Sequence, residues 1–309
     1  MRIHHGWTDI PDTARGASVA MGNFDGLHIG HQSVIDLARR PPASSRGQLG
    51  IVTFEPHPRQ VFAPEAAPFR LMNAEARANR LARLGIQELF ELPFTAEMAG
   101  MDPQVFVAQV LGGLGVAHVV VGADFRFGKG RTGEAQDLKR LAEAQGIAVT
   151  IAPLVARGGV EVSSTAIRVA LAEGRPRDAA DMLGHWHRIE GEVVHGEKRG
   201  RQLGYPTANM SVQGLHLPKL GVYAVKVDIL TGPQAGAHIG AASLGVRPQF
   251  GGTVPNLETF LFDFTGDLYG QHLSVALVDY LRPEMKFDGL QGLLDQMAAD
   301  CDRARAILS

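Results

Sequence analysis

The stretch that decides the fold is Gly22-Asn23-Phe24-Asp25-Gly26-Leu27-His28-Ile29-Gly30-His31, which directly follows the short apolar run 18–21. A strand that ends in a Gly-rich turn and passes into a helix directs backbone N–H groups and the positive end of the helix dipole at one point. Two imidazoles three residues apart share a helix face, where both can donate hydrogen bonds to an anion. Gly26 and Gly30 leave room for a phosphate near the backbone. This pattern predicts a nucleotide-phosphate cradle, whereas two histidines alone also fit solvated groups or an incidental metal pair.

A second candidate phosphate site lies far along the chain, at Ser163-Ser164-Thr165-Ala166-Ile167-Arg168. It again follows an apolar stretch, 149–155, and again opens a predicted helix, with hydroxyls at the cap and a guanidinium one turn in. Such a cap is most often purely structural. Taken together with the first motif, it predicts the other half of one clamp.

Composition limits the classes of protein to consider. The 309 residues are 45% hydrophobic, which suits two domains with cores of their own. A net charge of -2 lacks the electrostatic footprint of a dedicated nucleic-acid binder, so we expect small-molecule partners. The single cysteine, Cys301, excludes an internal disulfide and a thiolate metal cage. No apolar run has signal-peptide or membrane-spanning character, and we expect a cytoplasmic protein without membrane partners. The oligomeric state is open.

Residues 1–184 alternate between strand-like and helix-like segments. Strands are expected at 18–21, 49–54, 89–94, 116–122 and 149–155, and helices at 30–40, 74–84, from 102–103 onward, and 134–145. This alternation predicts an α/β domain, with a doubly wound parallel sheet covered by helices on both faces. Ligands of such sheets bind at the carboxyl ends of the strands, where both phosphate motifs fall.

Two further loops are expected at the same edge of the sheet. The loop 122–131 leaves a strand with basic groups, two aromatic rings and several glycines, which suits an anionic, partly aromatic ligand. It also fits a solvated basic loop. The segment 53–58, Thr53-Phe54-Glu55-Pro56-His57-Pro58, ends another strand, and its prolines would stiffen a wall of the site.

The pattern changes between residues 174 and 186, which predicts a domain boundary with domains 1–184 and 185–309. Beyond it, strands are expected at 188–194, 222–230, 238–244, 257–264 and 273–281, separated by Gly- and Pro-rich turns. Closely spaced antiparallel strands of this kind predict a small all-β barrel. A terminal helix, 290–308, would pack against it.

Glu258 stands out in the predicted barrel. Strand alternation through 257–264 puts its side chain on one face with Phe260, Phe262 and Phe264. Desolvation on an apolar face would make this carboxylate a better base, as deprotonation of an alcohol requires. The alternative is a solvated Glu at the open end of the strand.

A flexible basic loop precedes a second group of polar residues in the barrel. Residues 200–204 are followed by Thr207 and Asn209, two residues apart. Their hydroxyl and amide oxygens suit Mg²⁺ that carries a nucleotide phosphate.

With these residues in view, the chain resembles the bacterial bifunctional riboflavin kinases and FAD synthetases (FMN adenylyltransferases) along essentially its whole length. The motifs that carry the resemblance are 22–31, 53–58, 122–130, 163–168, 204–209, 221–223 and 281–287. Each motif alone is moderately specific, and their order and spacing together are highly specific. The resemblance explains two unlike phosphate sites in one chain, because the product of the kinase is the substrate of the adenylyltransferase.

The resemblance implies a two-step synthesis. In the barrel, riboflavin would be phosphorylated by ATP to FMN, with Glu258 as catalytic base and with Thr207 and Asn209 helping to hold Mg²⁺. In the α/β nucleotidyltransferase domain, the FMN phosphate would attack the α-phosphate of ATP, giving FAD and pyrophosphate. That nucleophile is already an anion, so the site needs stabilisation of the transition state rather than a base. His28, His31 and Arg168 suit this role.

The remaining assignments follow the same resemblance. The ATP site of the adenylyltransferase is assigned to Gly22, Phe24, Asp25, Gly26, His28, Gly30, His31, Ser163, Ser164, Thr165 and Arg168. Its flavin site is assigned to His57, Asp124, Phe125, Arg126 and Phe127. Binding of the nucleotide and the flavin in the kinase is assigned to Gly196, Lys198, Gly200, Gly204, Pro206, Tyr223 and Arg282.

The barrel departs from the family pattern at several positions. Ser243-Leu244-Gly245 and Arg247-Pro248-Gln249 stand where relatives usually read Asn-Ile-Gly and Arg-Pro-Thr, and Thr259-Phe260 replaces a common Val-His pair. Ser and Gln keep hydrogen-bonding capacity, so we expect altered affinity before lost activity. Two alternatives stay open: an adenylyltransferase whose barrel only binds flavin or regulates, and a nucleotidyltransferase acting on nicotinate or pantetheine phosphates.

Overall fold

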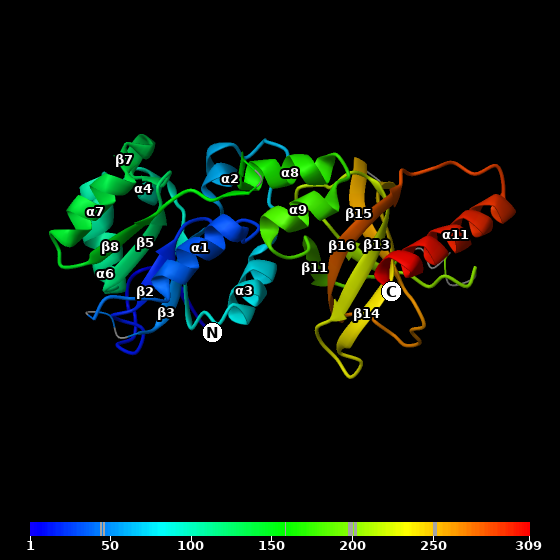
Figure 1. Ribbon diagram of the computed structural model, residues 1–309, viewed down its shortest axis with the longest axis horizontal. Coiled ribbons are helices and arrows are strands. Elements are labelled where there is room, and N and C mark those ends of the chain that lie inside the picture. The colour runs from blue at the N-terminus through cyan, green and yellow to red at the C-terminus, as the bar shows by residue number, and fades with distance from the viewer. Residues whose placement is uncertain (44, 46, 158, 197–199, 201–202, 250–251) are drawn as a thin grey trace. The chain divides into compact units, whose positions relative to one another are not determined.

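The computed structural model describes residues 1–43, 45, 47–157, 159–196, 200, 203–249 and 252–309 (Figure 1). The chain divides into two compact units, one formed by Met1–Ala66 and Arg77–Val162 and the other by Ala67–Ala76 and Ser163–Ser309. The second unit therefore takes in residues 163–184 together with the barrel. The functional boundary expected between residues 184 and 185 stays a prediction.

The first unit is built on a six-stranded parallel sheet in the order β1-β4-β3-β2-β5-β8. Its strands are β1 (Arg2–His5), β2 (Ser18–Met21), β3 (Leu49–Glu55), β4 (Glu88–Pro93), β5 (His118–Gly122) and β8 (Ala148–Ala152). All except β1 were predicted, with small differences at their ends. The edge strand β1 is short and mostly exposed, so it carries no periodic apolar signal.

Helices cover both faces of this sheet, as the doubly wound prediction requires. Every residue of β3 from Leu49 to Phe54 is buried, and burial of consecutive residues means that both faces are covered. The main helices are α1 (Ile29–Ala38), α3 (Ala74–Arg83), the π-helix η1 (Phe106–Leu111) and α7 (Ala135–Glu143). Helix α1 contacts β2, β3, β5 and β8, whereas α7 contacts β8 and η1.

Short elements complete the first unit. They are α2 (Pro58–Phe62), α4 (Ala96–Ala99), α5 (Pro103–Val105), α6 (Gly112–Leu114), β6 (Arg126–Phe127), the 3₁₀ turn η2 (Lys129–Arg131), β7 (Gly133–Glu134), β9 (Ala156–Arg157) and β10 (Val160–Glu161). Asp102 is the N-cap of α5, with proline at the first helical position, as the sequence predicts.

The strand order reverses at β2. The chain passes from β2 through α1 to β3 on one side, while β5 pairs with β2 on the other side. In open α/β sheets the crevice at such a switch point, outside the carboxyl ends of the strands, is where ligands bind. The turn 22–31 follows the carboxyl end of β2 directly, so it lies at the switch point.

The second unit contains a six-stranded antiparallel sheet in the order β11-β16-β13-β14-β15-β12. Its strands are β11 (Arg188–Glu192), β12 (Ala208–Ser211), β13 (Gly221–Ile229), β14 (Gly236–Gln249), β15 (Gly252–Leu261) and β16 (His272–Arg282). An isolated bridge joins Val194 to Asn209 of β12, so the two ends of the sheet meet and the barrel nearly closes. The short strand β12 was not predicted.

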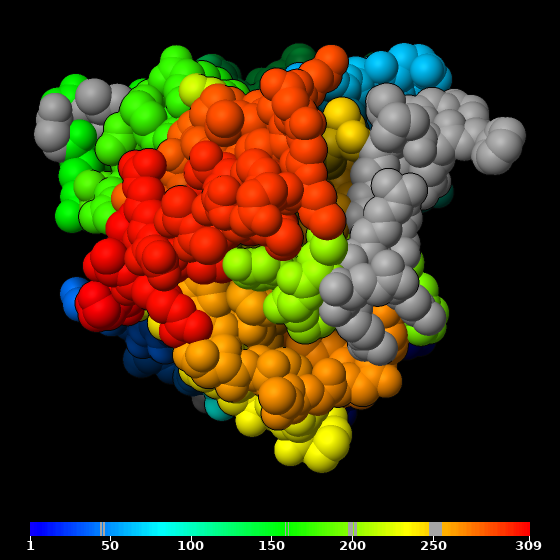
Figure 2. Space-filling view, turned by 90° about the vertical axis from the view of Figure 1, so that its right-hand side faces the viewer, coloured from blue at the N-terminus to red at the C-terminus, as the bar shows by residue number. Residues whose placement is uncertain are grey.

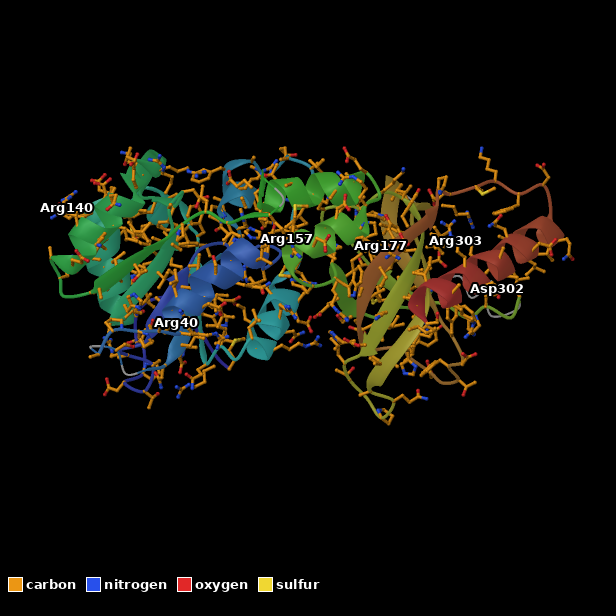
Figure 3. The ribbon with its side chains drawn as sticks, in the orientation of Figure 1. Arg40, Arg140, Arg157, Arg177, Asp302 and Arg303 are labelled. Atoms are coloured by element: carbon orange, nitrogen blue, oxygen red, sulfur yellow. The ribbon has the colours of Figure 1, made fainter. Side chains whose placement is uncertain are left out.

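Among its described residues, the second unit contains the helices α8 (Ser164–Ala172), α9 (Pro176–Leu183) and α11 (Leu290–Leu308). The barrel interior is apolar, and α11 packs on β13, β14 and β16 from outside. Figure 2 shows the red C-terminal residues and the orange-red segment before them over this side of the barrel. Arg303 of α11 donates to the backbone oxygen of Leu281 at 3.0 Å, and Arg177 of α9 bonds to Asp279 of β16 at 2.9 Å; both arginines are labelled in Figure 3. Among the described residues, no helix combines the length and hydropathy needed to cross a membrane.

Candidate functional sites

The turn 22–31 holds an unusual backbone. Phe24 and Leu27 have positive φ angles of 52° and 49°, and both side chains are buried. Positive φ is costly for residues with a Cβ, and such strain persists where the surrounding structure imposes it. Asp25, between them, is only 3% exposed. The turn is therefore a fixed shape rather than a mobile loop.

The two histidines form one stacked pair at the start of α1. Their ring centroids lie 3.6 Å apart with planes inclined by 17°. His28 is the N-cap, and its Nδ1 accepts a hydrogen bond from the backbone N–H of His31 at 3.2 Å. Because Nδ1 of His28 is an acceptor, its Nε2 carries the ring proton. The prediction that both imidazoles share one side of the helix is confirmed, with His28 at the cap instead of inside the helix.

His31 is held in its neutral form. Burial, and secondarily the neighbouring His28, keep the pKa of His31 well below its usual range. The ring also contacts Phe24, with centroids 5.2 Å apart. The buried Nδ1 of His31 has no hydrogen-bond partner among the described residues. A neutral imidazole can stabilise an anion by donating a hydrogen bond but brings no charge of its own.

Glycine has a more specific role here than open space for a phosphate. A Cβ built on Gly30 would lie 3.1 Å from ring atoms of His28, so Gly30 lets the imidazole fold back over the helix start. The same Cβ position is 3.8 Å from the backbone oxygen of Val162, the last residue of the first unit. Gly26 has a φ of +87°, which its lack of a Cβ makes accessible.

The two other predicted walls also follow strands of this edge. His57 follows β3 and caps α2, with its Nδ1 accepting from the backbone of Arg59 at 3.1 Å. The loop 122–131 follows β5. Its Phe125 stacks on Phe127 at 5.9 Å, and Arg126 pairs with Glu134 at the surface. The carboxyl ends of β2, β3 and β5, which are adjacent strands, thus bring all three segments to one edge.

Phe127 needs a different interpretation from the sequence prediction. Its side chain is 6% exposed and lies in the core of the first unit, against Phe106. Phe127 therefore packs in the core against Phe125 and does not line a site. Asp124, Phe125 and Arg126 keep some exposure and stay predicted flavin contacts.

The second phosphate motif caps α8 as predicted. Ser163 is the N-cap, and its Oγ accepts from the backbone N–H of Ala166 at 3.2 Å. Arg168, one turn on, donates from Nε to the backbone oxygen of Phe69 at 2.6 Å and lies over the Phe69 ring at 5.4 Å. These residues belong to the second unit, whereas His28 and His31 belong to the first. The clamp that would join them stays a prediction.

The barrel brings together the residues predicted for the catalytic base and the metal of the kinase. Asn209 of β12 and Ser243 of β14 are both direct partners of Glu258 on β15, so the three side chains share one face. Thr207 Oγ1 lies 3.4 Å from Glu258 Oε2. Asn209 Nδ2 donates to the backbone oxygen of Thr207 at 3.2 Å. Hydroxyl, amide and carboxylate oxygens thus converge at one end of the barrel.

The environment of Glu258 corrects the sequence prediction. Strand β15 ends at Leu261, so the alternation that was extended to Phe262 and Phe264 stops there. The residues of β15 buried in the barrel core are Leu257 and Leu261, on the opposite face. Glu258 is half-buried among polar groups, while Phe260 and Phe262 further along pack with residues of α11. Thr207 Oγ1 contacts the carboxylate, and the polar residues Asn209 and Ser243 are the strand partners of Glu258.

Sequence reasoning missed Asn256. Its Nδ2 donates to Asn209 Oδ1 at 3.0 Å, which fixes the amide of Asn209 with the oxygen on that side. A carbonyl oxygen has two lone pairs and can accept more than one interaction. Strand parity could have found Asn256, because it stands two residues before Glu258 on the same face.

The glycines of the loop that precedes β12 let its backbone pack closely against neighbouring residues of the barrel. A Cβ on Gly196 would lie within 2.6–2.8 Å of the Asn209 amide, and one on Gly200 would lie 2.4 Å from the backbone oxygen of Tyr205. Gly204 has a φ of +84°. Pro206 is exposed beside Thr207. Lys198 lies outside the described residues.

Two residues assigned to the kinase ligands have structural partners. Tyr223 is buried in the barrel interior, where its hydroxyl donates to the backbone oxygen of Lys219, and burial followed by Tyr280 raises its pKa. Its strand partner is Ala242, so it points to the face opposite Glu258. Arg282 donates from Nε and Nη2 to the Asp300 carboxylate of α11 at 2.7–3.0 Å. These placements argue against ligand contact by Tyr223 and make Arg282 a tie between β16 and α11.

A metal ion in the barrel would be bound by side-chain oxygens of different chemical types. Within the described ranges, no cluster of three or more His, Cys, Asp or Glu could hold a metal ion. Thr207 and Asn209 supply hard oxygen donors, which fit Mg²⁺ that retains water and substrate phosphates in its shell. The donor set therefore fits a nucleotide-borne Mg²⁺ better than a resident metal.

Comparison with known proteins matches two families to different parts of the chain. Residues 10–166 match the FAD synthetase family and residues 183–308 match the riboflavin kinase family. A bifunctional riboflavin kinase/FMN adenylyltransferase of Pseudomonas fluorescens is 38% identical over 309 residues, covering 99% of this chain and 98% of the relative. The protein of the same name from Listeria monocytogenes is 36% identical over 306 residues, covering 98% and 94%.

A solved structure extends the likeness to the fold. A Streptococcus pneumoniae protein described as a macrolide-efflux protein superposes with a TM-score of 0.84 at 32% identity, over 99% of each chain. The two family matches together span residues 10–166 and 183–308, and the two relatives are covered over 98% and 94% of their length. The chain belongs to the family of bifunctional riboflavin kinases/FMN adenylyltransferases.

Proposed function

We propose that the chain makes FAD from riboflavin in two ATP-dependent steps, phosphorylation in the barrel and adenylylation at the parallel sheet. The observation that carries the proposal is the stacked His28–His31 pair at the switch point between β2 and β5. It offers hydrogen-bond donors without charge to an incoming polyphosphate. The family membership of both halves supports the same two activities.

In the adenylylation step, an oxygen of the FMN phosphate attacks the α-phosphorus of ATP. A new P–O bond forms, the bond to the β-phosphate oxygen breaks, and pyrophosphate leaves with that electron pair. The nucleophile is an anion, so no general base is required. His28 and His31 stabilise the charge that develops on the phosphate oxygens. We assign Ser163, Ser164, Thr165 and Arg168 to the same ATP, and Gly22, Phe24, Asp25 and Gly26 to the shape of its cradle.

In the kinase step, the terminal ribityl hydroxyl of riboflavin attacks the γ-phosphorus of ATP and ADP leaves. The hydroxyl proton passes to a Glu258 carboxylate oxygen, because an alcohol is a poor nucleophile until its proton is removed. Thr207 Oγ1 orients that carboxylate from 3.4 Å. We assign Gly196, Gly200, Gly204 and Pro206 to the loop that binds the nucleotide.

Mg²⁺ is proposed as the cation of the kinase step, held on the protein side by Thr207 and Asn209. When bound with ATP, it would neutralise charge on the phosphates. We assign the binding of the flavin in the adenylylation step to His57, Asp124, Phe125 and Arg126. We place the enzyme in the cytoplasm, with small-molecule partners only.

A balance of all products tests the proposal. Wild-type protein incubated with riboflavin, Mg²⁺ and ATP should form FMN first and FAD afterwards. The ADP formed should equal the sum of FMN and FAD, and the pyrophosphate formed should equal FAD. Supplied FMN should give FAD and pyrophosphate without ADP. Formation of FAD only from supplied FMN would favour the adenylyltransferase-only alternative, and conversion of nicotinate or pantetheine phosphates with untouched flavins would refute the proposal.

A further inference from the structure

Arg77 is the largest fully buried side chain of the molecule among the described residues, with 0% exposure. It stands on α3, and its Nη2 donates to Glu55 Oε2 at 2.9 Å and to Glu91 Oε1 at 2.8 Å. Its Nε and Nη1 are buried and have no hydrogen-bond partner among the described residues. Arg77 thus commits one nitrogen to two carboxylates, which is an expensive arrangement for a buried cation unless the position of those carboxylates matters.

The two carboxylates mark the edge of the sheet where ligands bind. Glu55 is the last residue of β3, and Glu91 pairs in register with Thr53 on the neighbouring strand β4. In a strand, residues 53 and 55 point to the same face, so both carboxylates face α3. The ion pair therefore holds the carboxyl ends of β3 and β4 against one helix.

The chain beyond Glu55 depends on this anchor. His57 follows two residues later and caps α2, a five-residue helix with no buried side chain. The capping hydrogen bonds of His57 with Arg59 and Gln60 make residues 57–60 a rigid turn. Phe62, at the end of α2, contacts Phe94 but remains 65% exposed. Because the turn 57–60 buries few side chains, its position depends mainly on Glu55, the last residue of the strand before it.

The orientation of the His57 ring follows from the same turn. Because Nδ1 accepts the hydrogen bond from Arg59, the ring proton is on Nε2, which makes Nε2 the donor nitrogen of this ring. A displacement of Glu55 would move this donor with the turn. A misplacement of about 1 Å at a substrate-positioning group can cost about 100-fold in rate.

We propose that Arg77 is a positioning residue for FMN in the adenylylation step. It acts through Glu55, which sets the place of the His57 turn, and it does not itself touch the substrate. This inference rests on the proposed function and adds to it a residue outside every motif that carries the resemblance. Its prediction is selective: loss of Arg77 weakens the use of FMN much more than the use of ATP.

The test compares Arg77→Met, Arg77→Lys and wild type in steady-state adenylylation, with FMN and ATP varied separately. In Arg77→Met we expect KM for FMN to rise about tenfold, with KM for ATP within about twofold of wild type. Arg77→Lys keeps the charge and should recover part of the loss. Arg83→Met is the matched control, because Arg83 is an exposed arginine on the same helix. It should behave as wild type.

The second activity of the chain monitors folding. Riboflavin phosphorylation by the same preparations should be unchanged. If Arg77→Met does not fold, Glu55→Gln replaces it, and the same selective rise in KM for FMN is expected at about threefold. An unchanged KM for FMN in either folded variant, or an equal rise for FMN and ATP, would overturn the inference alone. Wild-type protein that forms no FAD from FMN and ATP would overturn the proposed function itself.

Discussion

The two reaction centres solve opposite problems with different side chains. At the parallel sheet the nucleophile would be a phosphate that is already charged, and the structure offers neutral, stacked imidazoles as hydrogen-bond donors. In the barrel the nucleophile would be a neutral alcohol, and the structure offers a carboxylate set between a hydroxyl and an amide. The difference teaches that proton removal, rather than phosphate binding, decides which groups each site requires.

The largest effect is expected from removal of the base. Glu258→Gln keeps the shape of the side chain but cannot take a proton. We expect riboflavin phosphorylation to fall about 100-fold to 10,000-fold, the usual share of general base catalysis. Conversion of supplied FMN to FAD should be unaffected and serves as the internal control. Phosphorylation at an undiminished rate would show that the barrel, like the sheet, works without a base.

A slightly smaller effect is expected at the sheet. His28→Ala removes a donor and the stacking partner of His31, and adenylylation should fall about 100-fold to 1,000-fold. The kinase rate should not change. His5→Ala, at an exposed histidine of β1, is the control and should leave both rates intact. Equal losses in both activities would mean that His28 supports folding rather than the reaction.

Acid should weaken the barrel unit through His187. Burial, followed by the neighbouring His185 and His216, lowers the pKa of His187 to about 3 from its usual 6.5. The unfolded chain binds the proton first, so stability is present above pH 6.5 and is lost as pH falls toward 3. Between pH 7.5 and 5.5 the loss should be about 1.4 kcal/mol from this group.

Urea unfolding followed by the fluorescence of Trp186, next to His187, would measure this loss in a Trp7→Phe background. His187→Leu should flatten the pH dependence of that transition, while His195→Leu, at an exposed histidine, should not. A slope that survives His187→Leu would assign the acid sensitivity to other groups.

The smallest effect is expected at Asn256. Asn256→Ala removes the hydrogen bond to Asn209 Oδ1, and one such bond contributes about 1 kcal/mol. We expect the Mg²⁺ concentration for half-maximal kinase activity to rise about three- to tenfold, with adenylylation unchanged. Asn79→Ala, at a residue of α3 outside the barrel, is the control. An unchanged Mg²⁺ requirement would leave Asn256 with no part in orienting Asn209.

The fold was largely predictable because buried parallel strands carry continuous apolar runs, as in residues 49–54 of β3. In the two large sheets the strands that escaped prediction are Arg2–His5 and Ala208–Ser211, and each has only four residues, too few to show a clear alternation. The end of β15 was placed too late because the phenylalanines beyond Leu261 continue the alternation without continuing the strand.

The parts of the candidate sites that lie within local sequence motifs were predictable. The imidazole pair follows from helical spacing, and the convergence of Thr207, Asn209 and Glu258 follows from their residue types. Long-range partners could not be predicted from spacing: Arg77 meets Glu91 through the tertiary fold, Asn256 bonds to Asn209 on a neighbouring strand, and Arg282 bonds to Asp300 of a distant helix. Gly30 was read as room for phosphate, whereas its first neighbour is the ring of His28.

The most direct test of two separate centres is the flavin product pattern of the two single variants, separated by chromatography after incubation with riboflavin, ATP and Mg²⁺. His28→Ala should accumulate FMN and form almost no FAD. Glu258→Gln should leave riboflavin untouched yet convert added FMN to FAD. Wild-type rates of FAD formation by His28→Ala, or of riboflavin phosphorylation by Glu258→Gln, would contradict the account.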